Sequence, residues 1–224
     1  MNELFCICIL ILAILSVYLS NKYFDKLGLI ILFIVSNILS FILTFKYITL
    51  SSLNFNSNSI TYVTMFTSLY LLLEQYQKKE VNSIVNLNFI INIFSALMLY
   101  IMSIYTQSLN DTISINMTNV FTNNYRILIF YPISLIISQK LLIVIYDKIK
   151  KLYDNIFIST VTTYLAVGLI ELIIYTSLTY INILSNPTII KILLSTYMIR
   201  LIITVLYSIF LTFILKKKVK EWII

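Results

Sequence analysis

The sequence lacks histidine altogether and has only two cysteines, two prolines and two glycines in 224 residues. Without histidine, a histidine-based zinc site, Ser-His or Cys-His catalysis and a histidine proton relay are all disfavoured. Cys6 and Cys8 are two positions apart and point to different faces of a helix, so we interpret them as packed thiols rather than as a disulfide or a metal pair. No catalytic residue, metal or cofactor is predicted, and no nucleotide-binding motif is present.

Charged residues are also scarce, at 11% of the chain against roughly 25% in ordinary soluble domains. Hydrophobic residues make up 60%, and the mean hydropathy is +0.95. Apolar windows of about 20 residues, the length that a helix needs to cross about 30 Å of hydrocarbon, recur along nearly the whole sequence. We therefore predict an all-α integral membrane protein, one polytopic domain over residues 1–224. Its seven predicted spans are approximately 4–20, 27–45, 60–76, 84–105, 125–146, 157–183 and 189–214. The first is expected to stay a helix, because it lacks the basic start and small-residue cleavage site of a signal peptide.

The positions of lysine and arginine predict the orientation in the membrane, because short cytoplasmic loops concentrate these residues. Most cations follow the first, third, fifth and seventh spans: Lys22, Lys26, Lys78, Lys79, Lys148, Lys150, Lys151, Lys216, Lys217, Lys218 and Lys220. Only Lys46, Arg126 and Lys191 lie near the other side. We expect the N-terminus outside and the C-terminus inside. The net charge of +7 is then a topology signal, to which attraction of "KKKVK" to anionic lipid can add, and not a sign of nucleic acid binding.

Three charged residues fall well inside predicted spans, where each costs at least about 2.5–3.5 kcal/mol and so needs a partner or a purpose. At about 1.5 Å per residue, both Glu171 and Arg200 come near the membrane midplane. A short turn joins their spans, so we expect Glu171 to meet Arg200. The pair is either a structural ion pair or part of a polar ligand site. Lys140 lies closer to the cytoplasmic end of its span, where snorkelling toward the headgroups is the favoured interpretation.

Other residues inside the spans have structural and functional interpretations that the sequence leaves open. Gly168 is three residues before Glu171 and allows close approach of a helix or of a ligand. Asn88 and Asn92 share one helix face, where hydrogen bonding between helices is favoured over a polar cavity. Pro132 predicts a kink in its span.

Several short patterns along about 190 residues together point to a family. They are Ser36-Asn37-Ile38, "YVTMFTSLYLLLEQYQKKE" at residues 62–80, "RILIFYPISLIISQK" with Ser138 and Gln139, "ISTVTTYLAVGLIELIIY" and "TYMIR". In this order and spacing the chain resembles the VUT family of bacterial queuosine precursor transporters. The resemblance implies a six-helix core related to the vitamin-binding subunits of energy-coupling-factor uptake systems, with span 4–20 as an added N-terminal helix.

The stretch 62–80 can be interpreted from its composition alone or from the family resemblance. By composition it is a span that ends in cytoplasmic water, with Glu74 and Lys78 as an ordinary i,i+4 pair. In the resemblance, Glu74 and Tyr76 are retained family positions, whereas Tyr70 stands where the family has an aspartate. The family aspartates are also replaced at Leu142 and, conservatively, at Glu171. The chain therefore resembles a divergent member.

The resemblance implies uptake of a small nucleobase-like compound, most simply a queuosine precursor of the 7-deazaguanine type. We expect Glu171 to accept hydrogen bonds from ligand N–H groups while Arg200 keeps it ionised, with amides and aromatic rings around the ligand. The expected ligand-binding residues are Glu171, Gln139, Tyr70, Glu74, Tyr76, Arg200 and Asn37. The expected location is a bacterial cell membrane, as a multi-pass protein whose partners are the substrate and the bilayer.

Other functional classes stay open at this point. The loss of family carboxylates also fits a membrane scaffold, assembly or immunity protein that retains the fold without transport. A vitamin-binding subunit of an energy-coupled transporter is a further alternative, as are a homo-oligomer and a complex with energy-coupling subunits. An intramembrane enzyme is the weakest alternative, because no nucleophile or metal centre can be assigned.

Overall fold

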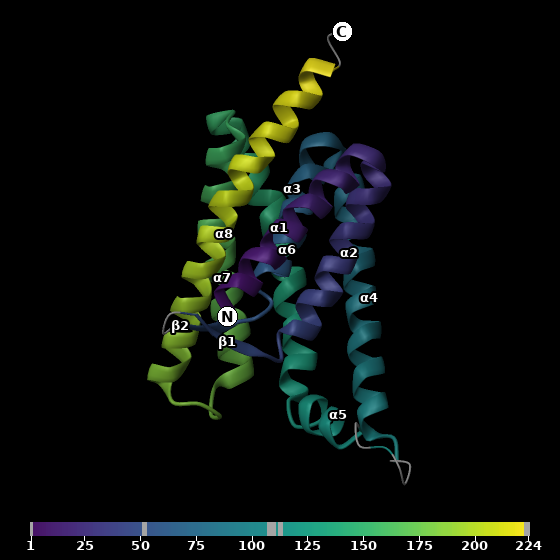
Figure 1. Cartoon of the computed structure of the whole chain (residues 1–224), viewed down its shortest axis with the longest axis vertical. Coiled ribbons are helices and arrows are strands. Elements are labelled where there is room, and N and C mark those ends of the chain that lie inside the picture. The colour runs from purple at the N-terminus through teal and green to yellow at the C-terminus, as the bar shows by residue number, and fades with distance from the viewer. Residues whose placement is uncertain (1, 51–52, 107–110, 112–113, 222–224) are drawn as a thin grey trace.

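The computed structural model describes residues 2–50, 53–106, 111 and 114–221, and the side chains of these residues as far as 215. Within this part of the chain, eight helices and two short strands follow one another (Figure 1). They are α1 (Asn2–Tyr23), α2 (Asp25–Leu43), β1 (Tyr47–Leu50), β2 (Leu53–Asn56), α3 (Ser59–Gln75), α4 (Lys78–Ile104), α5 (Ser114–Phe121), α6 (Tyr125–Tyr153), α7 (Ile156–Tyr180) and α8 (Asn186–Glu221).

Six of these helices are long and apolar enough to cross a membrane: α1, α2, α4, α6, α7 and α8 as far as Leu215. They coincide with six of the seven predicted spans. The remaining predicted span, 60–76, coincides with α3, which has only 17 residues. A helix of that length rises about 25 Å, less than the hydrocarbon thickness. The multi-pass prediction is confirmed for six spans, and a crossing by α3 stays a prediction.

The short helix α3 is the centre of the bundle. It contacts α1, α2, α4 and α8, and its side chains are buried continuously from Ser59 to Leu72 apart from Thr61. Its hydroxyl residues return hydrogen bonds to the helix itself, as Thr67 does to the carbonyl of Val63 at 2.8 Å. A helix that is apolar on all sides is suited to such a buried position. By contrast, α1 buries only Val17 and Asn21, in agreement with an added outer helix.

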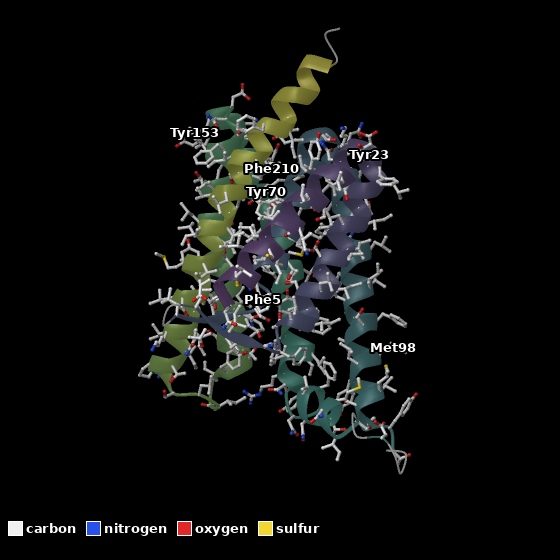
Figure 2. The ribbon with its side chains drawn as sticks, in the orientation of Figure 1. Phe5, Tyr23, Tyr70, Met98, Tyr153 and Phe210 are labelled. Carbon is white, nitrogen blue, oxygen red and sulfur yellow. The ribbon has the colours of Figure 1, made fainter. Side chains whose placement is uncertain are left out.

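The outer surface of the bundle is apolar over most of its height. Figure 2 shows Met98 of α4 projecting away from the other helices, and Phe5 of α1 is likewise 54% exposed. Many leucine and isoleucine side chains on α1, α2, α4 and α8 are exposed in the same way. A soluble protein does not expose so much contiguous apolar surface, whereas a bilayer covers it.

One end of the bundle carries a network of ion pairs between loops that are far apart in sequence. Lys26 at the start of α2 lies 2.8 Å from Glu80 at the start of α4. Asp147 near the end of α6 lies 3.3 Å from Lys78 and 3.1 Å from Lys151. These contacts gather three of the predicted cytoplasmic loops at one end, and Figure 2 shows Tyr23 and Tyr153 at that same end.

The predicted i,i+4 pair between Glu74 and Lys78 is wrong. Tyr76 has an extended backbone, with φ −135° and ψ 163°, and separates α3 from α4. The two charged residues therefore belong to different helices. Lys78 pairs with Asp147, and Glu74 pairs with Lys150 of α6 at 3.6 Å.

At the other end, the link between the predicted spans 27–45 and 60–76 folds as an antiparallel hairpin. Tyr47 is paired with Asn56, and Leu50 with Leu53. Strand β2 packs on α8, and the Tyr47 hydroxyl lies 2.6 Å from that of Tyr180. Burial raises the pKa of Tyr47, and neighbouring Tyr180 raises it further, so this phenol stays protonated. The all-α prediction is confirmed by the eight helices of the described chain, to which this short hairpin is added. Helix α5 is a further element that the sequence did not predict.

Candidate ligand site

Glu171 of α7 and Arg200 of α8 form an ion pair in the interior of the bundle. Nη1 of Arg200 lies 2.9 Å from Oε2 of Glu171, and the side chains are 1% and 0% exposed. The turn at 181–185 makes α7 and α8 neighbours, so the two residues meet as the sequence predicts. Desolvating two such charges costs several kcal/mol per ion, about as much as a good ion pair returns. The pair is therefore weak evidence for stability and calls for another explanation.

The guanidinium of Arg200 is also held by residues around the start of α3. Its Nη2 donates to Oδ1 of Asn58 at 2.9 Å, and its central carbon lies 3.7 Å from the ring centroid of Tyr62. A desolvated cation over an aromatic face gains about 2 kcal/mol or more. Arg200 is thus fixed in one orientation by three side chains, one from α7 and two from around the start of α3.

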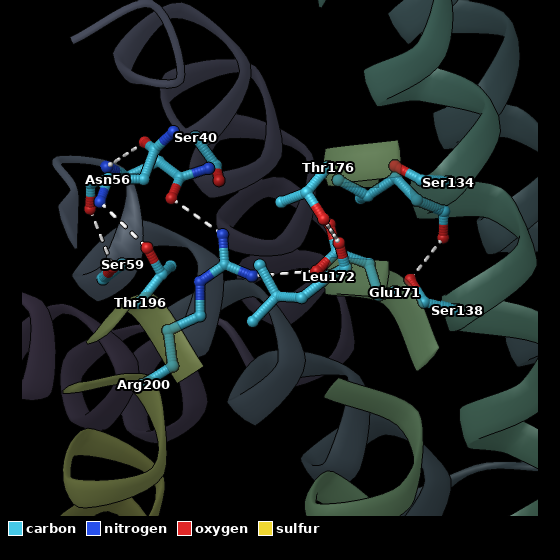
Figure 3. A network of polar contacts seen from close by, with 12 residues as sticks. Ser40, Asn56, Ser59, Ser134, Ser138, Glu171, Leu172, Thr176, Thr196 and Arg200 are labelled. Carbon is cyan, nitrogen blue, oxygen red and sulfur yellow. Dashed lines mark hydrogen bonds and ion pairs between the residues drawn. The ribbon is translucent and has the colours of Figure 1, made fainter. Parts of the chain in front are cut away.

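Asn58 is itself positioned by the hairpin and the end of α2. Its Nδ2 donates to Oγ1 of Thr44 at 2.6 Å, and its backbone N–H donates to Oδ1 of Asn56 at 3.1 Å. Asn56 in turn donates from Nδ2 to the Thr44 carbonyl at 3.0 Å and from its backbone to Oγ1 of Thr196 at 3.3 Å. Figure 3 shows Arg200 between this group and Glu171. The hairpin therefore forms one wall of the site.

Four buried polar atoms around the ion pair have no hydrogen-bond partner among the described residues. They are Oε1 of Glu171, Nε of Arg200 and the hydroxyls of Tyr62 and Tyr164. Both tyrosines lie near the ion pair, and the Tyr62 hydroxyl lies near the Glu171 carboxylate without forming a hydrogen bond of normal geometry to it. Buried polar groups without partners are few in folded proteins, and each calls for an explanation. The unpaired carboxylate oxygen of Glu171 can accept a hydrogen bond from a ligand, and the unpaired Nε–H of Arg200 can donate one to it.

Tyr70, Glu74 and Tyr76 lie away from this pair, toward the charged end. The Tyr70 ring contacts that of Tyr146 at 4.9 Å between centroids, and the Tyr146 hydroxyl donates to Oε1 of Glu74 at 2.7 Å. Glu74 is twelve residues from Tyr62 on the same helix, a rise of about 18 Å. The Tyr76 ring is covered by Lys26, at 5.0 Å. One small molecule bound at Glu171 does not span this distance, so these residues form a separate group at the charged end.

Gln139 and Asn37 occupy intermediate positions. Gln139 is 1% exposed; its Nε2 contacts Sδ of Met65 at 3.3 Å, and its Oε1 accepts from Nδ2 of Asn88 at 3.5 Å. The predicted hydrogen bonding of Asn88 between helices is thus present, although long. Asn37 is fully buried, and neither amide atom has a partner among the described residues.

Two of the other sequence predictions have structural outcomes. Lys140 donates to the amide oxygens of Asn82 and Asn86, the latter at 2.6 Å, which directs it toward the charged end as snorkelling predicts. A Cβ on Gly168 would lie 2.7 Å from the ring of Tyr164 on the same helix. Gly168 is therefore needed for the packing of that ring beside Glu171.

The hairpin residues that position Arg200 were missed by the sequence analysis. Asn56 and Asn58 lie in "SSLNFNSNS", which by composition is an ordinary polar link. Their burial depends on the hairpin folding back between α2 and α8, and no local pattern predicts that contact. Tyr62 begins the stretch 62–80 on which the family resemblance partly rests, but its role at the ion pair was not predicted, because that role depends on an arginine 138 residues away.

The fold and site together define a multi-pass helical membrane protein with a buried ionic site of incompletely paired atoms. The chain belongs to the family described as "Putative vitamin uptake transporter", which it matches over residues 56–214. Membership places it among uptake transporters of small molecules rather than among enzymes. The match excludes α1, α2 and β1, so the expected resemblance around Asn37 stays a prediction. No curated protein and no solved structure matches the chain.

Proposed function

We propose that this protein takes up a small nucleobase-like compound, with queuosine precursors of the 7-deazaguanine type as the first candidates. The observation that carries the proposal is the Glu171–Arg200 pair, in which Oε1 and Nε have no partner among the described residues of an uptake-family chain. Oε1 accepts from ligand N–H groups, and Nε donates to a ligand carbonyl or ring nitrogen. Such paired donors and acceptors occur along the edges of heterocyclic bases.

The ion pair suits this task because Arg200 neutralises the carboxylate without saturating it. Only one carboxylate oxygen is engaged, at 2.9 Å. The guanidinium is held by Asn58 and Tyr62, so it cannot turn to cover the other oxygen. Preorganised polar groups in a dry interior favour a ligand that completes their hydrogen bonds and reject one that leaves them unpaired.

Access to the site requires movement, since Glu171 and Arg200 are fully buried. We propose that the N-terminus and the hairpin lie outside and the C-terminus inside a bacterial cell membrane, so that the ligand enters from the hairpin end. The group at the charged end, where Glu74 contacts Tyr146 and Lys150, then lies on the way to the cytoplasm. Energy-coupling subunits or a second copy of the chain are compatible with this arrangement.

The test is uptake of labelled 7-deazaguanine and 7-aminomethyl-7-deazaguanine in a strain that depends on this protein. Glu171→Gln removes the charge while keeping the shape, and uptake should fall at least tenfold. Glu80→Gln is the matched control, because Glu80 also pairs with a cation but is about half exposed, at 48%. Unchanged uptake by the Glu171 variant would refute the proposal.

The description of the family leaves vitamins open as substrates, so the ligand class needs its own measurement. Purified protein should be screened by thermal unfolding against the two deazaguanines, guanine, thiamine, riboflavin and biotin. A ligand that binds the native state raises the melting temperature by linkage. Stabilisation by a vitamin alone would replace the nucleobase assignment, and no stabilisation by any compound would favour a scaffold that retains only the fold.

A further inference from the structure

Asn37 is the most incompletely paired side chain in the described part of the bundle. It is 0% exposed, and both Oδ1 and Nδ2 lack a hydrogen-bond partner there. Burying an amide without partners is costly, and no hydrogen bond among the described residues offsets the cost. Asn88 and Asn92 repeat the pattern, since each is buried with an unpartnered Oδ1.

These amides lie within about one helical turn of one another in depth. Lys26 of α2 pairs with Glu80 of α4 at 2.8 Å, which aligns the two helices at the charged end. Both helices run away from that end. Asn37 is eleven residues beyond Lys26 and Asn92 is twelve beyond Glu80, so their levels are about 16 and 18 Å from this reference point. Asn88 lies one turn closer to it.

The amide level is joined to the ion pair through α3. Asn88 donates to Gln139, which contacts Met65 of α3. Met65 is three residues from Tyr62, whose ring lies under Arg200. Three residues of helix rise about 4.5 Å. Through Gln139, the amide group therefore comes within one turn of α3 of the ring under Arg200, a separation that the two ends of one small molecule can cover. The two groups belong to different helices and have different chemistry.

We infer that Asn37, Asn88, Asn92 and Gln139 form a second, uncharged subsite, which binds the neutral edge of the transported compound. The inference rests on the proposed function. Amides offer donors and acceptors without net charge, so this subsite suits a lactam, carboxamide or aminopyrimidinone edge and does not suit a phosphate or carboxylate. The Glu171–Arg200 pair then faces the opposite edge of the same heterocycle, together with any charged substituent on that side.

The first test asks whether the amides serve the fold or a ligand, and it needs no ligand. Asn37→Leu removes a buried amide that makes no hydrogen bond in the described structure, with Asn37→Ala as a second variant in case leucine is too large. A residue kept for binding costs stability, so we expect at least one variant to melt at a higher temperature than the wild type. If both melt lower, the amide stabilises the fold and the subsite is refuted.

The second test separates the two subsites with two probes that differ by one group. Affinities for 7-deazaguanine and 7-aminomethyl-7-deazaguanine are measured by titration with purified protein. Asn37→Leu and Asn92→Leu should weaken both probes by the same factor, at least tenfold, whereas Glu171→Gln should weaken the aminomethyl compound by a larger factor than 7-deazaguanine. Asn86→Leu is the control, because that amide is exposed on the same helix as Asn92 and contacts Lys140.

The outcomes distinguish this inference from the proposed function. Wild-type affinity for both probes in the Asn37 and Asn92 variants, with affinity lost in Glu171→Gln, refutes the amide subsite alone. If the wild type binds neither probe, the deazaguanine assignment fails. The melting temperatures of the Asn37 variants then still decide whether the amides belong to a binding site.

Discussion

The guanidinium of Arg200 lies 3.7 Å from the ring centroid of Tyr62 while its two terminal nitrogens donate to Glu171 and Asn58. One side chain thus connects α8 with α7, with the start of α3 and, through Asn58, with the hairpin. A buried cation with this many fixed partners has one orientation. The consequences for stability and uptake can be measured separately.

Breaking the ion pair from one side should be costly, and removing both charges should not. Arg200→Met leaves Glu171 buried and unpaired, which should lower the free energy of unfolding by about 3–5 kcal/mol. The double variant with Glu171→Met should regain most of that stability, yet take up no ligand. Thermal unfolding in detergent measures the cycle. The exposed Lys26–Glu80 pair is the control, where the coupling should be within about 1 kcal/mol.

The ring and the hydroxyl of Tyr62 should have different roles. Tyr62→Phe keeps the face under Arg200 and removes a hydroxyl without a partner among the described residues, so its melting temperature should match or exceed that of the wild type. Tyr62→Leu also loses the cation–π contact, which should cost about 2 kcal/mol or more. Equal melting temperatures for the two variants would show that the ring does not stabilise Arg200.

The buried Asn58 should contribute more to stability than the residues of the same polar link whose side chains are exposed. Asn58→Ala removes its bonds to Arg200 and Thr44 and leaves the buried guanidinium short of one acceptor, which should cost about 1–3 kcal/mol. Asn54→Ala is the control, because the side chain of Asn54 is exposed and its amide oxygen accepts a hydrogen bond from the Thr49 hydroxyl on the same hairpin. We expect no change in melting temperature there, since the Asn54 carbonyl that accepts from Ser195 belongs to the backbone. A control as destabilised as Asn58→Ala would mean that hairpin formation, and not Arg200, is being measured.

The topology can be tested by labelling single cysteines in intact cells after Cys6 and Cys8 are replaced by serine. A membrane-impermeant maleimide should react with Asn54→Cys and not with Lys79→Cys, because α3 is predicted to separate the two positions. Lysed cells, where both should react, provide the control. Labelling of both positions in intact cells would show that α3 does not cross the membrane.

Much of the helical architecture could be predicted because it follows from local composition. Windows of about 20 apolar residues predicted α1, α2, α4, α6, α7 and α8, since an unpaired backbone cannot lie in hydrocarbon. The meeting of Glu171 and Arg200 was predictable for a similar reason, because two costly charges lie at one depth on helices joined by a short turn. The separation of Glu74 from Lys78 was not, since no breaker stands between them and only packing extends the chain at Tyr76.

The sequence by itself determined a membrane protein of many spans with a charged pair near its middle, because hydropathy and the cost of burying charge are properties of single residues and short windows. Only the tertiary structure decided which atoms of that pair remain unpaired, that Asn58 and Tyr62 hold the guanidinium, and that Asn37 is buried without a partner. These depend on a polar hairpin folding between helices and on the central place of α3. Contacts between residues more than a hundred positions apart are fixed by packing in three dimensions and leave no local pattern in the sequence.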